Sequence, residues 1–149
     1  IAGRIKNTIG IVSGLINNAA LNPSVEKNTH AFTRVESISY QEWTKHLDVG
    51  LFGAFACSKI FGLGMIEASV NGSIVNISSD HGLISPNQNL YTIDGMAEHD
   101  QPVKPIMYSV VKHGLIGMKH YFATYWSRYG IRVNTLCPGG VLSGQSEVF

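Results

Sequence analysis

The stretch Ser73-Ile-Val-Asn-Ile-Ser-Ser79 decides the fold of this 149-residue chain. Its β-branched residues predict a strand, and the Asn71-Gly72 turn marks where the strand begins. The strand ends in hydroxyl side chains, and the segment that follows is polar and irregular. We therefore expect a central strand whose carboxyl end carries polar groups.

Working outward, helices and strands alternate on both sides of this strand. Upstream, the capping box Ser39-Tyr-Gln-Glu42 opens a predicted helix from Tyr40 to about Ala68. Further upstream, the apolar run Ile9–Ile16 predicts a buried strand. Downstream, a predicted helix from about Ile106 to Tyr129 is followed by a strand over Ile131–Leu136.

The order strand, helix, strand, loop, helix, strand favours parallel pairing with right-handed crossovers. We therefore predict an α/β fold, namely part of a Rossmann-like, doubly wound parallel sheet. The predicted part holds three central strands with flanking helices.

Composition excludes several classes of function. The formal charge is +1 and the basic residues are scattered, so the chain has no electrostatic case for binding nucleic acid or an anionic membrane. No apolar run reaches membrane-spanning length, because glycines, Ser58 and Lys59 interrupt the longest one. Cys57 and Cys137 lack metal-ligand spacing, as do the histidines, so no metal site is predicted. We expect two buried free thiols and a cytoplasmic protein.

Tyr108 and Lys112 are one helical turn apart in Tyr108-Ser-Val-Val-Lys112, so their side chains share a face. A free phenol has a pKa of about 10, and a nearby ammonium favours the phenolate, which makes proton transfer feasible. The pattern alone is common in ordinary helices. Here both residues begin the helix after Ser73–Ser79, so they lie at the carboxyl edge of the sheet, where ligands bind in open α/β folds.

The other two predicted strands also end in polar or glycine-rich sequences, Asn17-Asn-Ala-Ala20 and Cys137-Pro-Gly-Gly-Val141. Taken together, these features resemble a short-chain dehydrogenase/reductase of the classical type. The matching pieces are Asn17-Asn-Ala-Ala20 for the family's Asn-Asn-Ala-Gly, Ser79 in a Ser-x-x-Gly, Tyr108-x-x-x-Lys112, and Arg132-Val-Asn134 leading to Pro138-Gly139.

The resemblance implies a role for each matching residue. Tyr108 would exchange a proton with the substrate hydroxyl or carbonyl. Lys112 would stabilise the phenolate and hold the nicotinamide ribose, and Ser79 would orient the substrate oxygen. NAD or NADP would be the cofactor, and the residues lining its site would be Asn17, Ala19, Tyr108, Lys112, Pro138, Gly139 and Val141.

Two departures from the family pattern bear on activity. Gly50 follows Asp48-Val49, where the family usually carries an Asn that anchors a water in a proton relay; a backbone carbonyl or another residue would have to serve instead, or the relay would be weakened. Residues 83–107 form an inserted substrate-side loop of about twice the usual length. Its run Glu98–Pro102 is similar to nucleotide-sugar members and suggests a polar, sugar-like substrate, although a solvated surface loop explains it equally well.

A third departure concerns the extent of the fold. The family's glycine-rich cofactor motif does not occur before Asn17, and the second strand is missing too. The last helix and strand after Val141 are also lacking. We interpret residues 1–149 as a partial Rossmann domain without its N-terminal βαβ unit and C-terminal end. Such a fragment is expected to bind dinucleotide poorly and to be inactive alone.

The expected function is NAD(P)-dependent interconversion of a secondary alcohol and a ketone on a small-molecule substrate. One alternative is a nucleotide-sugar epimerase or dehydratase of the extended type, and another is a non-catalytic binding protein that kept the fold. The resemblance also implies a homodimer or homotetramer through the two long helices. Gly53, Phe61, Gly117 and Phe122 are the contacts expected there.

Overall fold

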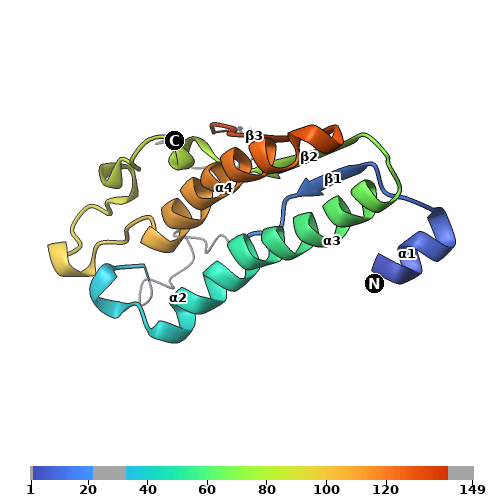
Figure 1. Cartoon of the computed structure of the whole chain (residues 1–149). Helices are drawn as coiled ribbons and strands as arrows, with labels where there is room; N and C mark the ends of the chain where they lie inside the picture. The colour runs from blue at the N-terminus through green and yellow to red at the C-terminus, as the bar shows by residue number, and fades with distance from the viewer. Residues whose placement is uncertain (1, 22–32, 141–149) are drawn as a thin grey trace.

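Three parallel strands form the centre of the computed structural model, which describes residues 2–21 and 33–140 (Figure 1). The strands are β1 (Gly14–Asn17), β2 (Gly72–Ile77) and β3 (Ile131–Leu136), in the order β1-β2-β3. Both neighbouring pairs are parallel, and Ile74 of β2 is in register with Leu15 and Val133. The predicted Rossmann-like parallel sheet with flanking helices is confirmed.

The helices agree with the expected order of elements. The α-helices are α1 (Ala2–Ile9), α2 (Tyr40–Leu47), α3 (Gly53–Glu67) and α4 (Ile106–Tyr125). Short helical turns are η2 (Val35–Ser37), η4 (Asp80–Gly82), η5 (Gln88–Tyr91), η6 (Glu98–Asp100) and η7 (Ser127–Tyr129). The π-helical segment η3 (Asp48–Phe52) joins α2 to α3, so one helix runs from Tyr40 to Glu67 as predicted. Its cap is the predicted one, because the Ser39 hydroxyl accepts the Glu42 N–H at 3.1 Å.

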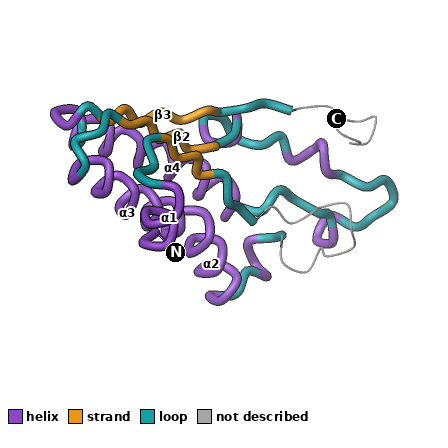
Figure 2. The backbone as a smooth tube through the Cα atoms, turned by 90° about the vertical axis from the view of Figure 1, so that its right-hand side faces the viewer, coloured by secondary structure: helices purple, strands orange, loops and turns teal. Residues whose placement is uncertain are grey.

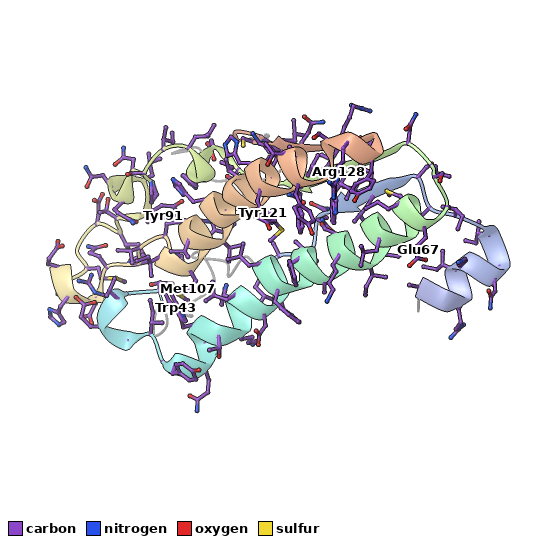
Figure 3. The ribbon with its side chains drawn as sticks, viewed as in Figure 1. Trp43, Glu67, Tyr91, Met107, Tyr121 and Arg128 are labelled. Atoms are coloured by element: carbon purple, nitrogen blue, oxygen red, sulfur yellow. The ribbon has the colours of Figure 1, made fainter. Side chains whose placement is uncertain are left out.

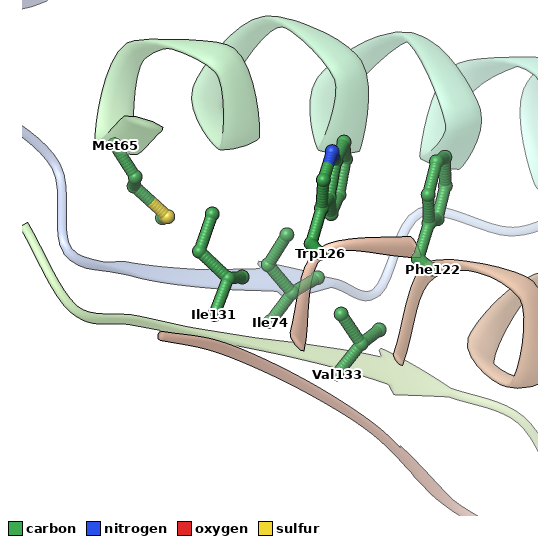
Figure 4. Close-up of a cluster of buried hydrophobic side chains, with 6 residues drawn as sticks. All are labelled: Met65, Ile74, Phe122, Trp126, Ile131 and Val133. Atoms are coloured by element: carbon green, nitrogen blue, oxygen red, sulfur yellow. The ribbon is translucent and has the colours of Figure 1, made fainter. Parts of the chain in front are cut away.

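Helices α3 and α4 lie side by side against one face of the sheet, as Figures 1 and 2 show from two directions. The core forms between these helices and the inward side chains of β2 and β3. Its buried members, drawn in Figure 4, are Met65, Ile74, Phe122, Trp126, Ile131 and Val133. Trp126 stacks on Phe122 with ring centroids 4.2 Å apart.

The first strand differs from its prediction. Ile9 ends helix α1 instead of opening a strand, because Gly10 takes a φ of 100° that ends the helix, and pairing with β2 starts only at Gly14. The expected burial is also wrong for Ile16, which is 69% exposed. Side chains alternate along a strand, so Ile16 points away from the helices, to a face that no described helix covers.

Two further expectations from composition are wrong. Cys57 is exposed and Cys137 only partly buried, because α3 turns Ala54 and Ser58 toward the sheet and leaves Cys57 outside. By length and composition alone, the helix Tyr40–Glu67 is sufficient to cross a membrane, with a mean hydropathy of 1.7. Core helices of water-soluble proteins pass the same test, and here one side of α3 packs on the sheet.

The segment predicted as an inserted loop, residues 83–107, is a loop up to Pro105, since α4 begins at Ile106, and the loop contains several hydrogen bonds of its own. The Gln101 side chain binds Ile93 at both N–H and C=O, at 2.8 and 3.0 Å, and also donates to the Met96 carbonyl at 2.8 Å. Pro102 and Pro105 are fully buried. Tyr91 of this loop is labelled in Figure 3, close to the first turns of α4. The loop thus has a defined shape, although most of its side chains from Leu83 to Asp100 are exposed.

Two glycines of α3 allow a matched test of the helix packing. A Cβ added at Gly62 would lie 2.7 Å from the Trp126 ring, whereas one added at Gly64 would meet nothing within 4 Å. We expect Gly62→Ala to lower the free energy of unfolding by about 1–3 kcal/mol through overpacking. Gly64→Ala should be neutral or stabilise by up to about 1 kcal/mol, since alanine favours helix. Urea unfolding of the complete protein measures both; equal effects would contradict the packing described here.

Candidate active site

The carboxyl ends of β2 and β3 are joined into one rim by backbone hydrogen bonds. The Ser78 N–H donates to the Leu136 carbonyl at 2.8 Å, and the Asp80 N–H donates to the Pro138 carbonyl at 2.9 Å. Beyond Ile77 the chain turns into η4, which packs against α4. Residues after both strands and the start of α4 therefore share one edge of the sheet, as predicted for a ligand site.

Lys112 is the buried cation of this rim. It is only 5% exposed, and its Nζ donates to the Ile77 carbonyl at 2.9 Å. The same Nζ lies 5.4 Å from the centre of the Tyr108 ring. Burial lowers the pKa of Lys112, and the proximity of Cys137 acts in the opposite direction. The structure therefore places the Lys112 ammonium beside the Tyr108 ring, at the start of α4.

Ser79 is buried where the chain leaves β2, and its hydroxyl donates to Asp80 Oδ1 at 2.6 Å. That hydrogen bond lowers the pKa of Asp80 more than any other contact, and the His81 N–H adds to the effect. The His81 ring stands edge-on to Tyr108, with centroids 6.1 Å apart. Ser79, Tyr108 and Lys112 thus lie at the same rim, with Asp80 holding the serine hydroxyl.

Asn17 is hydrogen-bonded within the fold at the end of β1. Its side chain is buried, and Nδ2 donates to Ser58 Oγ and Asn76 Oδ1 at 2.9 Å each. Asn76 in turn donates to the Leu115 carbonyl at 3.4 Å. This network joins β1, α3, β2 and α4, so the Asn17 side chain fixes the end of β1 within the fold.

The remaining residues expected at the cofactor site lie at the strand ends. Ala19 and Gly139 are exposed, and Pro138 is partly buried. A Cβ added at Gly139 would approach only Asp80 Oδ2, at 3.9 Å, so the space above the end of β3 is open. Val141 lies outside the described residues.

Gly50, which replaces the family's usual Asn, lies in the π-helical segment η3 and packs on α4. A Cβ at position 50 would collide with Val111 Cγ1, one residue before Lys112. The space that an asparagine would need is therefore filled by a valine side chain, and the glycine is required by this close contact.

Sequence reasoning missed Asp80, Tyr91 and Lys104. The Lys104 Nζ lies over the Tyr108 ring at 4.1 Å from its centre, nearer than Lys112. Burial raises the pKa of Tyr91, and Tyr108 and Asp80 contribute to the shift. Pro105 separates Lys104 from the helix, so no helical spacing links it to Tyr108 in the sequence. Within residues 2–21 and 33–140, no cluster of three metal-ligating side chains occurs.

The parallel sheet and the Tyr108–Lys112 pair at its carboxyl edge define an α/β chain of Rossmann type. A family model described as enoyl-(acyl carrier protein) reductase, one of the short-chain dehydrogenases/reductases, matches residues 1–148. The chain belongs to the short-chain dehydrogenase/reductase family.

Curated relatives agree with this assignment. The 2,5-dichloro-2,5-cyclohexadiene-1,4-diol dehydrogenase of Sphingobium indicum is 30% identical over 132 residues, which are 89% of this chain and 44% of the relative. The ribulose-forming D-arabinitol 2-dehydrogenase of Scheffersomyces stipitis is 31% identical over 129 residues, 87% of this chain and 38% of the relative. The chain thus spans less than half the length of these relatives.

Solved structures share the fold. A short-chain dehydrogenase from Leptospira borgpetersenii with bound NAD+ superposes with a TM-score of 0.82 at 28% identity, covering 99% of this chain and 51% of that one. The NADP-bound protein ElxO has a TM-score of 0.70 at 25% identity, with 92% and 46% covered.

The contact between Gly50 and Val111 generates a prediction. Restoring the family residue with Gly50→Asn should lower the free energy of unfolding by about 1–3 kcal/mol, because the new side chain overlaps Val111. Adding Val111→Ala should recover part of that loss, giving a coupling energy of about 1 kcal/mol or more. A double-mutant cycle by urea unfolding of the complete protein measures it; additive effects would mean that the two positions do not compete for space.

Proposed function

We propose that the protein containing this chain is an NAD(P)-dependent oxidoreductase that interconverts a secondary alcohol and a ketone. The observation that carries the proposal is the buried Lys112 ammonium, 5.4 Å from the ring of Tyr108 at the carboxyl edge of the sheet. A cation buried at some energetic cost beside a phenol is typical of a functional site.

In this proposal Tyr108 accepts the proton of the substrate hydroxyl during oxidation and returns it during reduction. Lys112 stabilises the phenolate, and its bond to the Ile77 carbonyl holds the ammonium in position. Ser79 fixes the substrate oxygen, so its hydroxyl would exchange the bond to Asp80 Oδ1 for one to the substrate. The nicotinamide, when bound, takes or gives the hydride.

The open end of β3 fits the nicotinamide half of such a cofactor. Gly139 leaves space at the rim, and Pro138 is fixed by its bond to Asp80. Ala19 is exposed at the end of β1, on the same carboxyl edge. The binding of NAD+ and NADP by the solved relatives supports NAD or NADP here. Ala19, Pro138, Gly139 and Lys112 would hold that half, and Val141 is proposed from the sequence alone.

Polyols and related diols are the proposed substrate class. One relative is named for a cyclohexadiene-1,4-diol and another for D-arabinitol, and both names describe substrates with more than one hydroxyl group. The polar loop over residues 83–107 lies beside Tyr108 and supports a hydroxyl-rich substrate.

The alternative of a non-catalytic binding protein draws support from Gly50 and Val111, which leave no room for the family's usual Asn.

Replacing the phenol tests the proposal. In the complete protein, Tyr108→Phe should lower kcat for secondary-alcohol oxidation by about a hundredfold or more, because the acid–base group is lost. The Kd for NADH or NADPH should stay close to that of the wild type. Tyr40→Phe, at a highly exposed tyrosine on α2, is the matched control and should keep full activity. Full activity of Tyr108→Phe would overturn the proposed chemistry.

We also propose a homo-oligomer through α3 and α4. The expected contact Phe122 is wrong, because that ring lies in the subunit core and is stacked between Trp126 and Phe55. Of the other expected contacts, Gly53 and Phe61 are partly buried and Gly117 is exposed. An exposed aromatic patch instead covers the two helices: Phe52, Phe55, Tyr121 and Tyr125. Contiguous exposed aromatic side chains are typical of protein interfaces.

The aromatic patch gives a direct test of assembly. Tyr121→Glu places a charge in the patch and should convert a dimer or tetramer of the complete protein into a smaller species. Tyr40→Glu, at another highly exposed tyrosine on α2, is the control and should leave the assembly intact. Size-exclusion chromatography with light scattering measures both, and a wild-type monomer would rule out the proposed assembly.

A further inference from the structure

Asp80 joins the serine of the candidate site to the segment that follows β3. Its Oδ1 accepts the Ser79 hydroxyl at 2.6 Å and the His81 N–H at 2.7 Å. Its backbone N–H donates to the Pro138 carbonyl at 2.9 Å, and a Cβ added at Gly139 would lie 3.9 Å from its Oδ2. One carboxylate therefore lies between the residue proposed to fix the substrate oxygen and the segment proposed to hold the nicotinamide.

The direction of the hydrogen bond between Ser79 and Asp80 follows from the charge of the carboxyl group. The bond from Ser79 is the largest cause of the lowered pKa of Asp80; partial burial opposes it, and the neighbouring His81 and Lys104 add to it. Asp80 is therefore ionised at neutral pH, and an ionised carboxylate can only accept hydrogen bonds. The Ser79 hydroxyl must be the donor, so its single proton is directed at Asp80.

This bond decides what Ser79 can offer to a ligand. A hydroxyl group has one proton to donate and two lone pairs that accept. The His81 N–H holds Asp80 Oδ1 in place and also approaches Ser79 Oγ at 3.3 Å, so the short turn after β2 fixes both partners of the bond. With its proton held by Asp80, Ser79 is prepared to accept a hydrogen bond from a ligand and not to donate one.

The two redox forms of the proposed substrate differ in what they need from this serine. A secondary alcohol carries a proton that it can donate to Ser79 Oγ. A chain of hydrogen bonds can then run from the Tyr108 phenol through the alcohol and Ser79 to Asp80. A ketone oxygen only accepts, so it can bind Ser79 only after the hydroxyl has left Asp80. Hydrogen bonds to charged groups are among the stronger ones, so this exchange weakens the binding of the ketone.

We propose that Asp80 is a positioning residue that sets the direction of the Ser79 hydroxyl and makes the site bind the alcohol form of its substrate more tightly than the ketone. The inference rests on the proposed function and adds a residue to its machinery. Asp80 acts through Ser79 and needs no contact with the substrate. The exchange of the Ser79 hydroxyl is then required for the ketone, whereas the alcohol binds without it, and the ketone leaves the site more readily.

The ligands for the test are D-arabinitol and D-ribulose, the alcohol and the ketone of one carbon skeleton, on the complete protein. Calorimetric titration measures the Kd of D-arabinitol with the reduced cofactor bound and the Kd of D-ribulose with the oxidised cofactor bound. Neither combination can react at the carbon where the two ligands differ. The measured quantity is the ratio of the Kd for D-ribulose to the Kd for D-arabinitol. Comparing each variant with the wild type cancels the contribution of the cofactor's redox state.

The variants separate positioning from a structural role. Asp80→Ala removes the acceptor, and Asp80→Asn keeps an uncharged oxygen in its place. Ser79→Ala, alone and combined with Asp80→Ala, removes the hydroxyl through which Asp80 would act. Glu67→Ala removes an exposed carboxylate at the end of α3, labelled in Figure 3, and is the control.

We expect Asp80→Ala to lower the Kd ratio by about tenfold or more, because the released Ser79 hydroxyl can donate to the ketone. Asp80→Asn should lower the ratio less, and Glu67→Ala should leave it unchanged. When Ser79 is already alanine, Asp80→Ala should have no further effect on the ratio. An equal rise of both Kd values in Asp80→Ala, the result expected of a purely structural carboxylate, would overturn the inference. So would a shift of the ratio that persists without the Ser79 hydroxyl.

Turnover of Tyr108→Phe separates the inference from the proposed function. If Tyr108→Phe loses turnover and Asp80→Ala shifts the Kd ratio, both proposals stand. If Tyr108→Phe still oxidises D-arabinitol, the proposed chemistry fails, and the Kd ratio still decides the role of Asp80. If the wild type binds neither ligand, the proposed polyol class is wrong, and the inference that rests on it fails too.

Discussion

Lys112 is attached to the end of β2 from both its backbone and its side chain, and the geometry of the site depends on this attachment. Its ammonium donates to the Ile77 carbonyl, and its own carbonyl accepts the Ser78 hydroxyl at 2.7 Å. The approach is so close that a Cβ at Gly82 would lie 2.9 Å from the Lys112 carbonyl oxygen. Helix α4 is thereby locked in register with the strand, and Tyr108, one turn earlier, is set at the rim. Because Lys112 couples the helix to the strand end, a shift of Lys112 would also shift Tyr108.

Small residues make this close packing possible along the whole contact between the long helices. Val111 packs against Gly50, and the Trp126 ring packs against Gly62. Leu51 packs against Gly114, where an added Cβ would lie 2.7 Å from Leu51 Cδ2. The buried network from Asn17 through Asn76 to Leu115 adds hydrogen bonds that join the sheet to α4. Packing between the helices and hydrogen bonding beneath the rim therefore support the same arrangement. The loss of the family's usual Asn at position 50 follows from this packing, since Val111 occupies its space.

The sequence predicted those parts of the fold and site that depend on local patterns. β3 and the Tyr108–Lys112 pair follow from alternation and helical spacing, which involve neighbouring residues only. The predicted start of the first strand at Ile9 was wrong, because pairing with β2 begins only at Gly14 and the apolar run does not determine it. The direction of Asn17 could not be predicted, since its partners Ser58 and Asn76 are 41 and 59 residues away. Contacts through space of this kind leave no spacing to detect.

The position of Lys104 is a second feature that sequence spacing could not predict, and it concerns the candidate site. Lys104 precedes Tyr108 by four positions, which is the spacing of a helical pair, yet Pro105 stands before the helix and has an extended backbone. The lysine meets the phenol because Gln88, sixteen residues upstream, fixes the loop. The positions of Tyr108 and Lys112 are thus set by a helix and a strand, and the position of Lys104 is set by a loop with its own hydrogen bonds. The rigid elements place the proposed acid–base pair. Loops on such a scaffold generally vary more than the elements they connect, so the proposed substrate class would depend on this loop.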